Sequence, residues 1–361
     1  MNIPVRAASH SYEVTIGAGI LQQGFGTLPK KVSSYDKVVV LTDAHVWEAQ
    51  GEYFTAQVNF PYELLIMPAG EACKSFDNFM DVQSFLIDKK CTRKSLAIAF
   101  GGGAVGDLVG FAAATYMRGI DFIQVPTTIL AHDSAVGGKT AINLPQAKNI
   151  VGAFFQPQAV LYDTNLLTSL SDKEVRSGMT EVVKHAMISD ETWLHELMQR
   201  PIVGLSQQQL AEDLAKGIRV KAKIVEEDET EQSVRKYLNL GHTYGHAIEA
   251  AAGYGGLAHG EAVMIGLVYC LLLGENYGQM TRDFTERFLQ FARDNGYLFE
   301  EVKNHDFDTL LSYMMKDKKA DYGELQFVLL ESIGKPFVQK VTAEECRQVD
   351  QQFRQLLGVW E

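Results

Sequence analysis

The first 165 residues alternate short apolar runs with segments of helical periodicity. Between the runs, residues 75–90 repeat apolar side chains at a helical spacing, and Ser75 is placed to cap that helix. Strands separated by helices predict an α/β domain with a mostly parallel, Rossmann-like sheet covered on both faces. The predicted strands lie at residues 37–43, 62–67, 95–100, 121–126 and 159–163.

The pattern changes near residue 165, beyond which helical periodicity replaces the apolar runs. A chain of 361 residues is long enough for two domains, each with its own core. We therefore predict an α/β domain over residues 1–165 and an all-α domain over residues 166–361. The predicted helices of the second domain lie at residues 172–188, 207–227, 236–252, 260–274 and 282–295.

Composition and charge narrow the classes of function. No apolar run is long enough to span a bilayer, and the first residues do not form a signal peptide, so we expect no membrane partner. The four cysteines are scattered and are expected to be reduced, as in a cytoplasmic protein. A net charge of −12 without a basic stripe argues against a nucleic-acid partner. A small anion could still bind in a locally basic pocket.

Residues 237–261 hold the densest cluster of chemically active side chains. His242 and His246 are four residues apart and share one face of a predicted helix, and His259 follows a glycine-rich turn that could fold it back onto that face. Imidazoles that converge from two helices form divalent-metal sites. Paired helix histidines are, however, more often hydrogen-bonded or exposed groups. The spacing alone therefore leaves the ligand set open.

A glycine-rich motif follows one of the predicted strands. Gly101, Gly103 and Gly106 fit the pattern G-x-G-x-x-G between a strand and a helix, where backbone N–H groups can approach a pyrophosphate. A tight strand-to-helix turn explains the same glycines equally well. Asp121 follows at the usual distance but begins a strand, so Asp43, which ends one, is the better candidate for binding ribose hydroxyls.

Two further segments carry charged residues in apolar surroundings. Lys139 directly follows paired glycines in an apolar loop, and lysine suits phosphate oxygens, although a single surface lysine is usually only solvated. Glu181 and Lys184 are three residues apart on a predicted helix, where a surface ion pair is the simplest explanation. The residues before Glu181 carry too few charges for a solvated face, so we expect this carboxylate to be buried beside a metal or a cation.

These motifs, in this order, resemble the 3-dehydroquinate synthase family, which is related to the iron-containing and glycerol dehydrogenases. The resemblance extends from about residue 43 to about residue 319. It is carried by Gly-Gly-Gly-Ala-Val-Gly-Asp (101–107), Tyr-Met-Arg-Gly (116–119), Val-Pro-Thr-Thr (125–128), Asp-Ser-Ala-Val-Gly-Gly-Lys (133–139), Lys-Asn (148–149), Gly-Met-Thr-Glu-Val-Val-Lys (178–184), Leu-Asn-Leu-Gly-His-Thr-Tyr-Gly-His-Ala-Ile-Glu (238–249) and His-Gly-Glu-Ala-Val (259–263).

The resemblance implies NAD in the first domain, a divalent metal at a cleft between the domains, and a homodimer. Zinc is the metal it favours, with cobalt as the alternative. The implied metal ligands are Glu181, His242 and His259. The implied NAD residues are Asp43, Glu71, Lys74, Gly102, Gly103, Asp107, Thr127 and Thr128. The implied substrate residues are Asp133, Lys139, Lys148, Asn149, Lys184, Lys221, Glu231, Arg235, Asn239, His246 and Lys318, together with Arg118, which is implied to reach into the site of a partner subunit.

The implied reaction converts 3-deoxy-D-arabino-heptulosonate 7-phosphate to 3-dehydroquinate and phosphate, a step of the shikimate pathway. NAD would remove a hydride and return it, so that phosphate elimination, ring opening and an intramolecular aldol closure leave no net redox change. Lys139, Asn149 and His246 would hold the phosphate, and Arg235 with Lys221 would hold the carboxylate. Two departures from the family pattern are a shorter run over residues 128–133 and an apolar residue at position 144.

Three other functions fit parts of the same pattern. One is a cyclase acting on another sugar phosphate, which would not need both Arg235 and Lys221 if its substrate lacked a carboxylate. Another is an NAD- and metal-dependent polyol dehydrogenase, whose uncharged substrate would not need these cations together with Lys139 and Lys148. The last is a metal- and nucleotide-binding regulatory protein, against which the complete set of matched polar residues argues.

Overall fold

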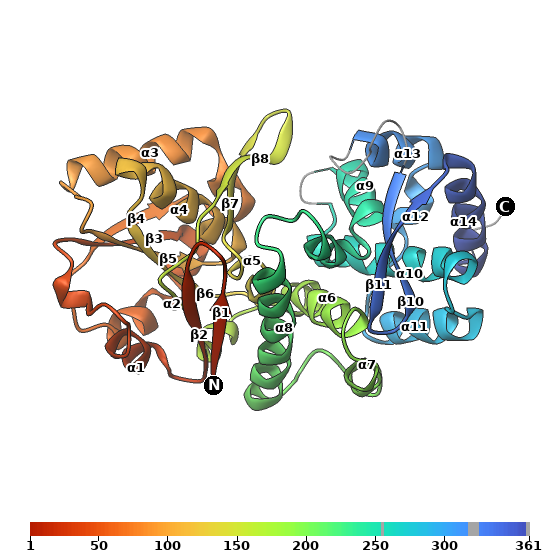
Figure 1. Cartoon of the computed structure of the whole chain (residues 1–361), viewed down its shortest axis with the longest axis horizontal. Helices are drawn as coiled ribbons and strands as arrows, with labels where there is room; N and C mark the ends of the chain where they lie inside the picture. Colours follow the sequence, from red (N-terminus) through yellow and green to blue (C-terminus); the bar gives the residue numbers. More distant parts are fainter. Residues whose placement is uncertain (254–255, 317–324, 359–361) are drawn as a thin grey trace. The chain divides into compact units, whose positions relative to one another are not determined.

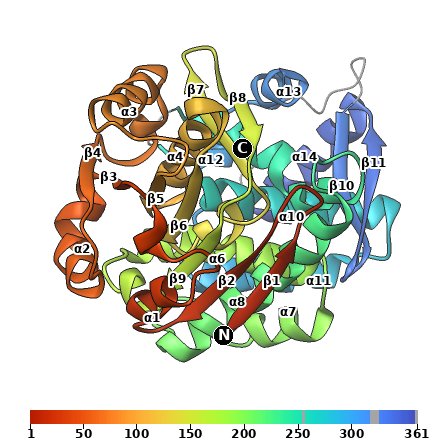
Figure 2. The same cartoon turned by 60° about the vertical axis from the view of Figure 1, so that its left-hand side comes forward.

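The computed structural model describes residues 1–253, 256–316 and 325–358, which form two compact units (Figure 1). The first unit comprises Met1–Leu170 and Ser206–Thr230, and the second comprises Ser171–Leu205 and Glu231–Glu361. This division differs from the predicted single boundary near residue 165. The reason is helix α8 (Gln207–Glu227), which packs against β1 and β2 of the first unit (Figure 2). Helical periodicity alone does not show which core an apolar face joins.

A seven-stranded sheet forms the centre of the first unit, in the order β1-β2-β9-β6-β5-β3-β4. Strands β1 and β2 pair antiparallel, and all the other neighbours pair parallel. This confirms the mostly parallel sheet that the sequence predicts and adds the N-terminal hairpin to it. The strands are β1 (Asn2–Arg6), β2 (Ser11–Gly17), β3 (Val38–Asp43), β4 (Glu63–Met67), β5 (Leu96–Gly101), β6 (Asp121–Pro126) and β9 (Ala159–Asp163).

Helices cover both faces of this sheet because its central strands are apolar on both sides. In β3, Val39 and Leu41 belong to the core under α3 and α4, whereas Val38 and Val40 belong to the core under α1 and α2 (Figure 1). Besides α8, the helices of the first unit are α1 (Leu21–Gly26), α2 (Ala44–Gln57), α3 (Phe76–Asp88), α4 (Gly103–Thr115) and α5 (Ala131–Ser134), with the 3-10 helices η1 (Val32–Ser34), η2 (Gly70–Lys74), η3 (Tyr116–Arg118) and η4 (Thr164–Leu167).

The segment around Lys139, predicted as an apolar loop, is instead an antiparallel hairpin of β7 (Lys139–Leu144) and β8 (Ala147–Phe154). Its apolar character has a packing cause, because β7 lies against α4. Gly110 of α4 permits this approach, since a Cβ at that position would lie 2.4 Å from the methyl group of Thr140. The interpretation of Lys139 as a loop residue is therefore wrong, although its position directly after two glycines stands.

The second unit is helical, as predicted, and also contains one antiparallel hairpin that the sequence interpretation did not include. Gly334, with φ of 82°, supplies the left-handed residue in the turn of that hairpin. Its strands are β10 (Leu325–Ser332) and β11 (Lys335–Val341). The helices are α6 (Asp172–Met187), α7 (Glu191–Met198), α9 (His242–Ala252), α10 (His259–Tyr277), α11 (Arg282–Asp294), α12 (Glu301–Asn304), α13 (Phe307–Lys316) and α14 (Ala343–Leu356), with η5 (Val234–Asn239).

Two of these helices bear on the site. Helix α10 is buried on all sides from Gly260 to Gly274, which explains its apolar sequence. The single helix predicted over residues 236–252 is two elements, because Gly241 adopts a left-handed conformation (φ of 78°) between η5 and α9. Among the residues that the structure describes, no helix is long and apolar enough to cross a membrane.

Candidate active site

Glu181 from α6, His242 and His246 from α9, and His259 from the first residue of α10 gather around one point in the second unit. The ring centroids of the three histidines are 5.2, 5.5 and 5.8 Å apart. Oε1 of Glu181 lies 3.7 Å from Nε2 of His242 and 3.9 Å from Nε2 of His259. The predicted return of His259 to the face that carries His242 and His246 is therefore confirmed.

This geometry fits a divalent metal. Zinc ligands lie about 2.1 Å from the ion, so two ligand atoms of a tetrahedral site are roughly 3.4 Å apart, close to the separations around Glu181. Glu181 is 2% exposed, and within the described part of the chain its Oε1 accepts no hydrogen bond. Lys184 pairs with one oxygen, and the other points at the two imidazoles. A buried acceptor in that position calls for a cation.

Hydrogen bonds orient the two imidazoles next to Glu181. Nδ1 of His242 donates to the carbonyl of Leu240 (3.0 Å), and Nδ1 of His259 donates to Oε2 of Glu249 (3.0 Å). Both Nε2 atoms are thereby left as lone-pair donors, which is the usual arrangement of metal-binding histidines. Burial lowers the pKa of His259, but the hydrogen bond to Glu249 and the charges of Glu249 and Glu181 outweigh it, so the pKa is raised overall.

Glycines bring the three ligand-bearing helices close together. A Cβ at Gly266 of α10 would lie 1.9 Å from the carbonyl oxygen of Gly241, directly before His242. A Cβ at Gly245 would lie 3.0 Å from the backbone of α10. At the other end, a Cβ at Gly260 would lie 1.9 Å from the carbonyl oxygen of Ser177 on α6. The residues next to the histidines thus set the distances between α6, α9 and α10.

In the first unit, the glycine-rich motif forms the predicted strand-to-helix turn between β5 and α4. Gly102 caps α4 without a side-chain hydrogen bond, so the first N–H groups of this 13-residue helix lack a side-chain acceptor at the cap. A Cβ at Gly102 would lie 3.0 Å from Thr128, and one at Gly103 would lie 2.8 Å from Ser134. The Thr127 hydroxyl is buried and has no hydrogen-bond partner among the described residues. This arrangement fits a pyrophosphate at the helix N-terminus.

Three predicted NAD residues, Glu71 and Lys74 of η2 and Asp107 of α4, form one polar cluster with Asn149, which is predicted to bind the substrate phosphate. Nζ of Lys74 donates to Asp107 (2.8 Å) and to Oδ1 of Asn149 (2.5 Å) and lies 3.7 Å from Glu71. Burial raises the pKa of the Asp107 carboxyl. Burial also lowers the pKa of Lys74, but the charges of Asp107 and Glu71 outweigh that effect and raise it. Elsewhere in the first unit, Asp43 caps α2 by accepting a hydrogen bond from the backbone N–H of Val46 (3.0 Å).

The remaining predicted residues fall into smaller groups. Nζ of Lys221 lies 3.0 Å from the Asp133 carboxylate, both in the first unit. In the second unit, Asn239 donates to Glu231 (2.9 Å), and Arg235 lies completely buried between them in the sequence. Lys318 lies outside the described residues. Three predicted substrate residues of the first unit are exposed. They are Lys139 at the start of β7, Lys148 on β8 and Arg118 at the end of η3.

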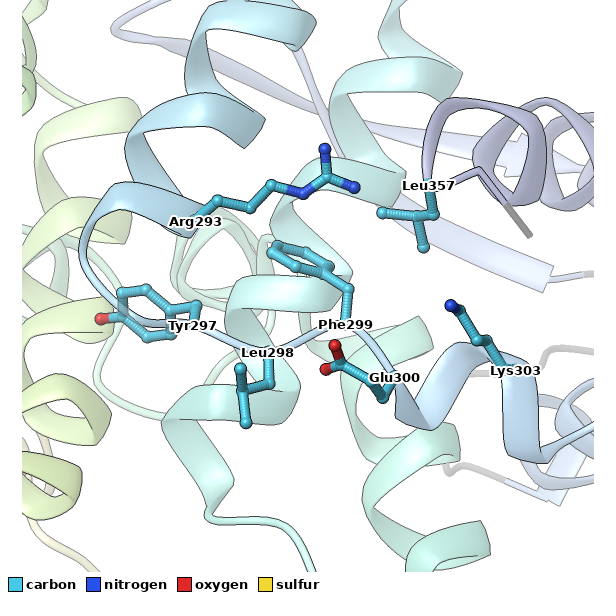
Figure 3. Close-up of a pocket in the computed structure, with 7 residues that line it drawn as sticks. All are labelled: Arg293, Tyr297, Leu298, Phe299, Glu300, Lys303 and Leu357. Carbon is cyan, nitrogen blue, oxygen red and sulfur yellow. The ribbon is translucent and has the colours of Figure 1, made fainter.

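Sequence reasoning missed two residues that contact predicted site residues, Glu249 and Asn143. Glu249 lies seven residues after His242 on the same helix face, but the spacing did not show that it would bind a histidine. Asn143 carries no sequence signal at all. A surface pocket of the second unit contains none of the predicted site residues (Figure 3). It is lined by Arg293, Tyr297, Leu298, Phe299, Glu300, Lys303 and Leu357.

Comparison with solved structures defines the class. A crystal structure of 2-deoxy-scyllo-inosose synthase, complexed with carbaglucose-6-phosphate, NAD+ and Co2+, has the same fold. Its TM-score is 0.86 at 27% identity, covering 98% of this chain and 99% of that one. A 2-epi-5-epi-valiolone synthase from Streptomyces hygroscopicus subsp. jinggangensis 5008, with NAD+ and Zn2+ bound, shares the fold with a TM-score of 0.81 at 22% identity, covering 96% and 97%. The fold is that of the sugar phosphate cyclases.

Sequence comparison then identifies the family. The family profile described as 3-dehydroquinate synthase N-terminal matches residues 64–177, and the profile described as 3-dehydroquinate synthase C-terminal matches residues 178–320. The 3-dehydroquinate synthase of Lysinibacillus sphaericus (strain C3-41) is 62% identical over 359 residues, which is 99% of both chains. The chain belongs to the 3-dehydroquinate synthase family, as its motifs indicate.

Proposed function

We propose that this chain is the enzyme that converts 3-deoxy-D-arabino-heptulosonate 7-phosphate to 3-dehydroquinate and phosphate. The observation that carries the proposal is the identity of its buried cations. Among the described residues, the buried lysines and arginines are Lys74, Lys184, Lys221 and Arg235, each 5% exposed or less. Buried cations are rare because their desolvation is unfavourable, and all four are predicted to bind NAD or the doubly anionic substrate.

The proposed roles follow from the chemistry of each group. A divalent metal held by Glu181, His242 and His259 would lower the pKa of the substrate hydroxyl to be oxidised, and NAD would accept and return the hydride. The chain itself binds and orients. Arg235, with its planar fork, and Lys221 would hold the substrate carboxylate. Asp133 already fixes the ammonium group of Lys221 at 3.0 Å, so Lys221 is positioned before the carboxylate arrives.

The phosphate of the substrate would lie with Lys139, Asn149 and His246. Its own oxygens can take the proton that leaves in the elimination, so no side chain of the chain needs to act as that base. Lys184 pairs with Glu181 and balances the charge of this buried carboxylate. Glu231 accepts a 2.9 Å hydrogen bond from Asn239, and the buried Arg235 lies between these two residues in the sequence. These residues would orient the substrate rather than change covalently.

We further propose that the first unit binds NAD, that the second binds the metal, and that the chain acts as a homodimer in the cytoplasm. Arg118 would reach the site of the partner subunit, as the family resemblance implies. The four cysteines are buried and none forms a disulfide, as expected for a protein kept in a reducing compartment.

The deciding experiment follows phosphate release from the heptulosonate phosphate with catalytic amounts of NAD, with and without a chelator, while absorbance reports NADH. We expect release that stops when the metal is removed, with no accumulation of NADH. Accumulation of NADH with polyols, without phosphate release, would instead identify a dehydrogenase. Turnover of a sugar phosphate without a carboxylate would identify a different cyclase, and the buried Arg235 would then need another explanation.

A further inference from the structure

Asn143 lies where the pairing of β7 with β8 becomes irregular. The register of the hairpin shifts between Ile142 and Leu144, so Asn143 has no regular partner on β8. It forms instead an isolated parallel bridge with Ser75, the residue that follows η2. Two segments of the first unit that lie far apart in the sequence are therefore joined at this one residue.

The side chain of Asn143 connects the same two segments by two hydrogen bonds. Its Nδ2 donates to Oε1 of Glu71 (2.6 Å), and its Oδ1 accepts from the backbone N–H of Asn149 (3.0 Å). A carboxamide carries its donor and its acceptor on two separate atoms of one short side chain, so Asn143 can make both hydrogen bonds at once. Aspartate would keep the acceptor but would place a second carboxylate against Glu71.

Such support matters for Asn149 because its backbone is left-handed, a mildly strained conformation for asparagine. Its φ is 57°, in the left-handed region that residues other than glycine seldom adopt. Asn143 holds its N–H, and Lys74 donates to its side chain at 2.5 Å. Both Asn143 and Lys74 also contact Glu71. Any shift of Glu71 or Lys74 is therefore transmitted directly to Asn149.

We propose that Asn143 is a positioning residue that couples NAD binding to binding of the substrate phosphate. The inference rests on the proposed function, which assigns Glu71 and Lys74 to NAD and Asn149 to the phosphate. NAD contacts at Glu71 and Lys74 fix the side chains that hold Asn149 in its strained conformation, so each ligand strengthens the binding of the other. The coupling is reciprocal, as thermodynamic linkage requires.

Asn143→Asp tests this coupling. Loss of the donor, with two carboxylates facing each other, should weaken NAD binding about tenfold. It should raise the KM for the heptulosonate phosphate by a similar factor while changing kcat less. Gln146→Ala is the matched control, because Gln146 is an exposed carboxamide at the turn of the same hairpin. A purely structural role would instead lower the melting temperature and kcat without a selective change in KM.

The decisive measurement is calorimetric titration of NAD with and without inorganic phosphate, in the unmodified protein and in both variants. We expect phosphate to tighten NAD binding in the unmodified protein and in Gln146→Ala, and to have little effect in Asn143→Asp. Equal effects of phosphate in all three proteins, or no effect in any, would overturn the proposal. Binding needs no turnover, so the result stands apart from the catalytic assay, whose failure would refute the proposed function alone.

A second variant guards against misfolding of the first. Asn143→Ala removes both hydrogen bonds without adding charge, and its combination with Glu71→Ala, which removes the acceptor, completes a double-mutant cycle on NAD affinity. We expect the two substitutions to be strongly non-additive, because each breaks the same hydrogen bond. Additive effects would show that Asn143 acts on NAD by another route and would contradict the coupling.

Discussion

At the scale of single residues, backbone strain coincides with predicted substrate contacts. Among the described residues, those other than glycine with positive φ are Lys90, Met117, Arg118, Asn149 and Glu231. Three of these, Arg118, Asn149 and Glu231, are predicted to contact substrate. A left-handed conformation costs Arg118 and Glu231 about 1–2 kcal/mol each and Asn149 less, and it persists where the surroundings enforce it. These side chains are therefore held where local preference would not place them, as binding residues often are.

Glu249 gives a residue-scale prediction about the metal. Because its carboxylate accepts from Nδ1 of His259 at 3.0 Å, it fixes the tautomer and increases the basicity of Nε2. Glu249→Gln keeps the shape but removes the charge, and should weaken zinc binding roughly 10–100-fold with little effect on NAD affinity. Competition with a chromophoric chelator measures the zinc dissociation constant.

The control for that variant is Glu301→Gln. Glu301 lies 3.3 Å from Nε2 of His305, a glutamate–histidine pair of the second unit that includes none of the predicted metal ligands. Zinc affinity should not change in this control. If Glu249→Gln also bound zinc as tightly as the unmodified protein, the hydrogen bond to His259 would have no part in metal binding.

At the scale of elements, the approach of α10 to the turn before α9 leads to the next prediction. A Cβ at Gly266 would lie 1.9 Å from the carbonyl oxygen of Gly241, so Gly266→Ala must push α10 away from the turn that precedes His242. We expect the free energy of unfolding to fall by about 1–3 kcal/mol, as in other overpacked cores. Zinc affinity should fall in the same variant. Denaturant unfolding and chelator competition measure the two effects.

Gly274→Ala on the same helix separates packing from helix propensity. A Cβ at Gly274 would lie 3.0 Å from Cγ of Met280, a flexible side chain that can move. Both substitutions gain the same helix propensity, about 1 kcal/mol. Gly274→Ala should therefore be close to neutral and should bind zinc normally. Equal destabilisation of the two variants would show that the closeness of α10 to Gly241 is not what matters.

The elements that the sequence predicts well are those whose burial is local and continuous. Residues 207–227 were predicted as a helix, and α8 (Gln207–Glu227) has those bounds, because its apolar face repeats without interruption. Strand β8 could not be found in this way: residues 150–154 are apolar, but most residues of the strand are exposed, so its burial is not continuous. The hairpins depend on pairing between segments, and their register is set by the partner strand as much as by their own residues.

The residues of the candidate site could likewise be predicted only in part from the sequence. Spacing put His242 and His246 on one helix face but could not tell which of them binds the metal. The family resemblance supplied the choice of Glu181 over His246, and the hydrogen bonds of the folded chain show Glu249 bound to His259. Asn143 meets Glu71 across 72 residues of sequence, a contact that only the tertiary fold creates.

At the scale of the whole molecule, the chain is acidic, yet its described residues include four buried cations. There are 33 lysines and arginines against 45 acidic residues, which gives the net charge of −12. The four buried cations, two in each unit, coincide with predicted NAD and substrate contacts. Net charge therefore says little about the ligand, and the location of the buried charges says more.

The proposed homodimer leads to a prediction about mixed subunits. Arg118→Ala should be inactive because each site lacks the arginine from its partner, and His259→Ala should be inactive because it lacks a metal ligand. In a mixed dimer, the site of the Arg118→Ala subunit keeps its metal ligands and receives Arg118 from the His259→Ala subunit. Co-expression in equal amounts should therefore restore about a quarter of the unmodified activity, since half the dimers are mixed and each has one complete site.

Two controls make this complementation decisive. Each variant expressed alone must stay inactive at the same total concentration, and tandem purification through two different tags must recover the activity in the mixed species. A His259→Ala subunit paired with Glu181→Ala should restore nothing, because both substitutions damage the metal site of their own subunit. If the Arg118→Ala mixture also stayed inactive while mixed dimers formed, Arg118 would act within its own subunit, and each chain would hold a complete site without its partner.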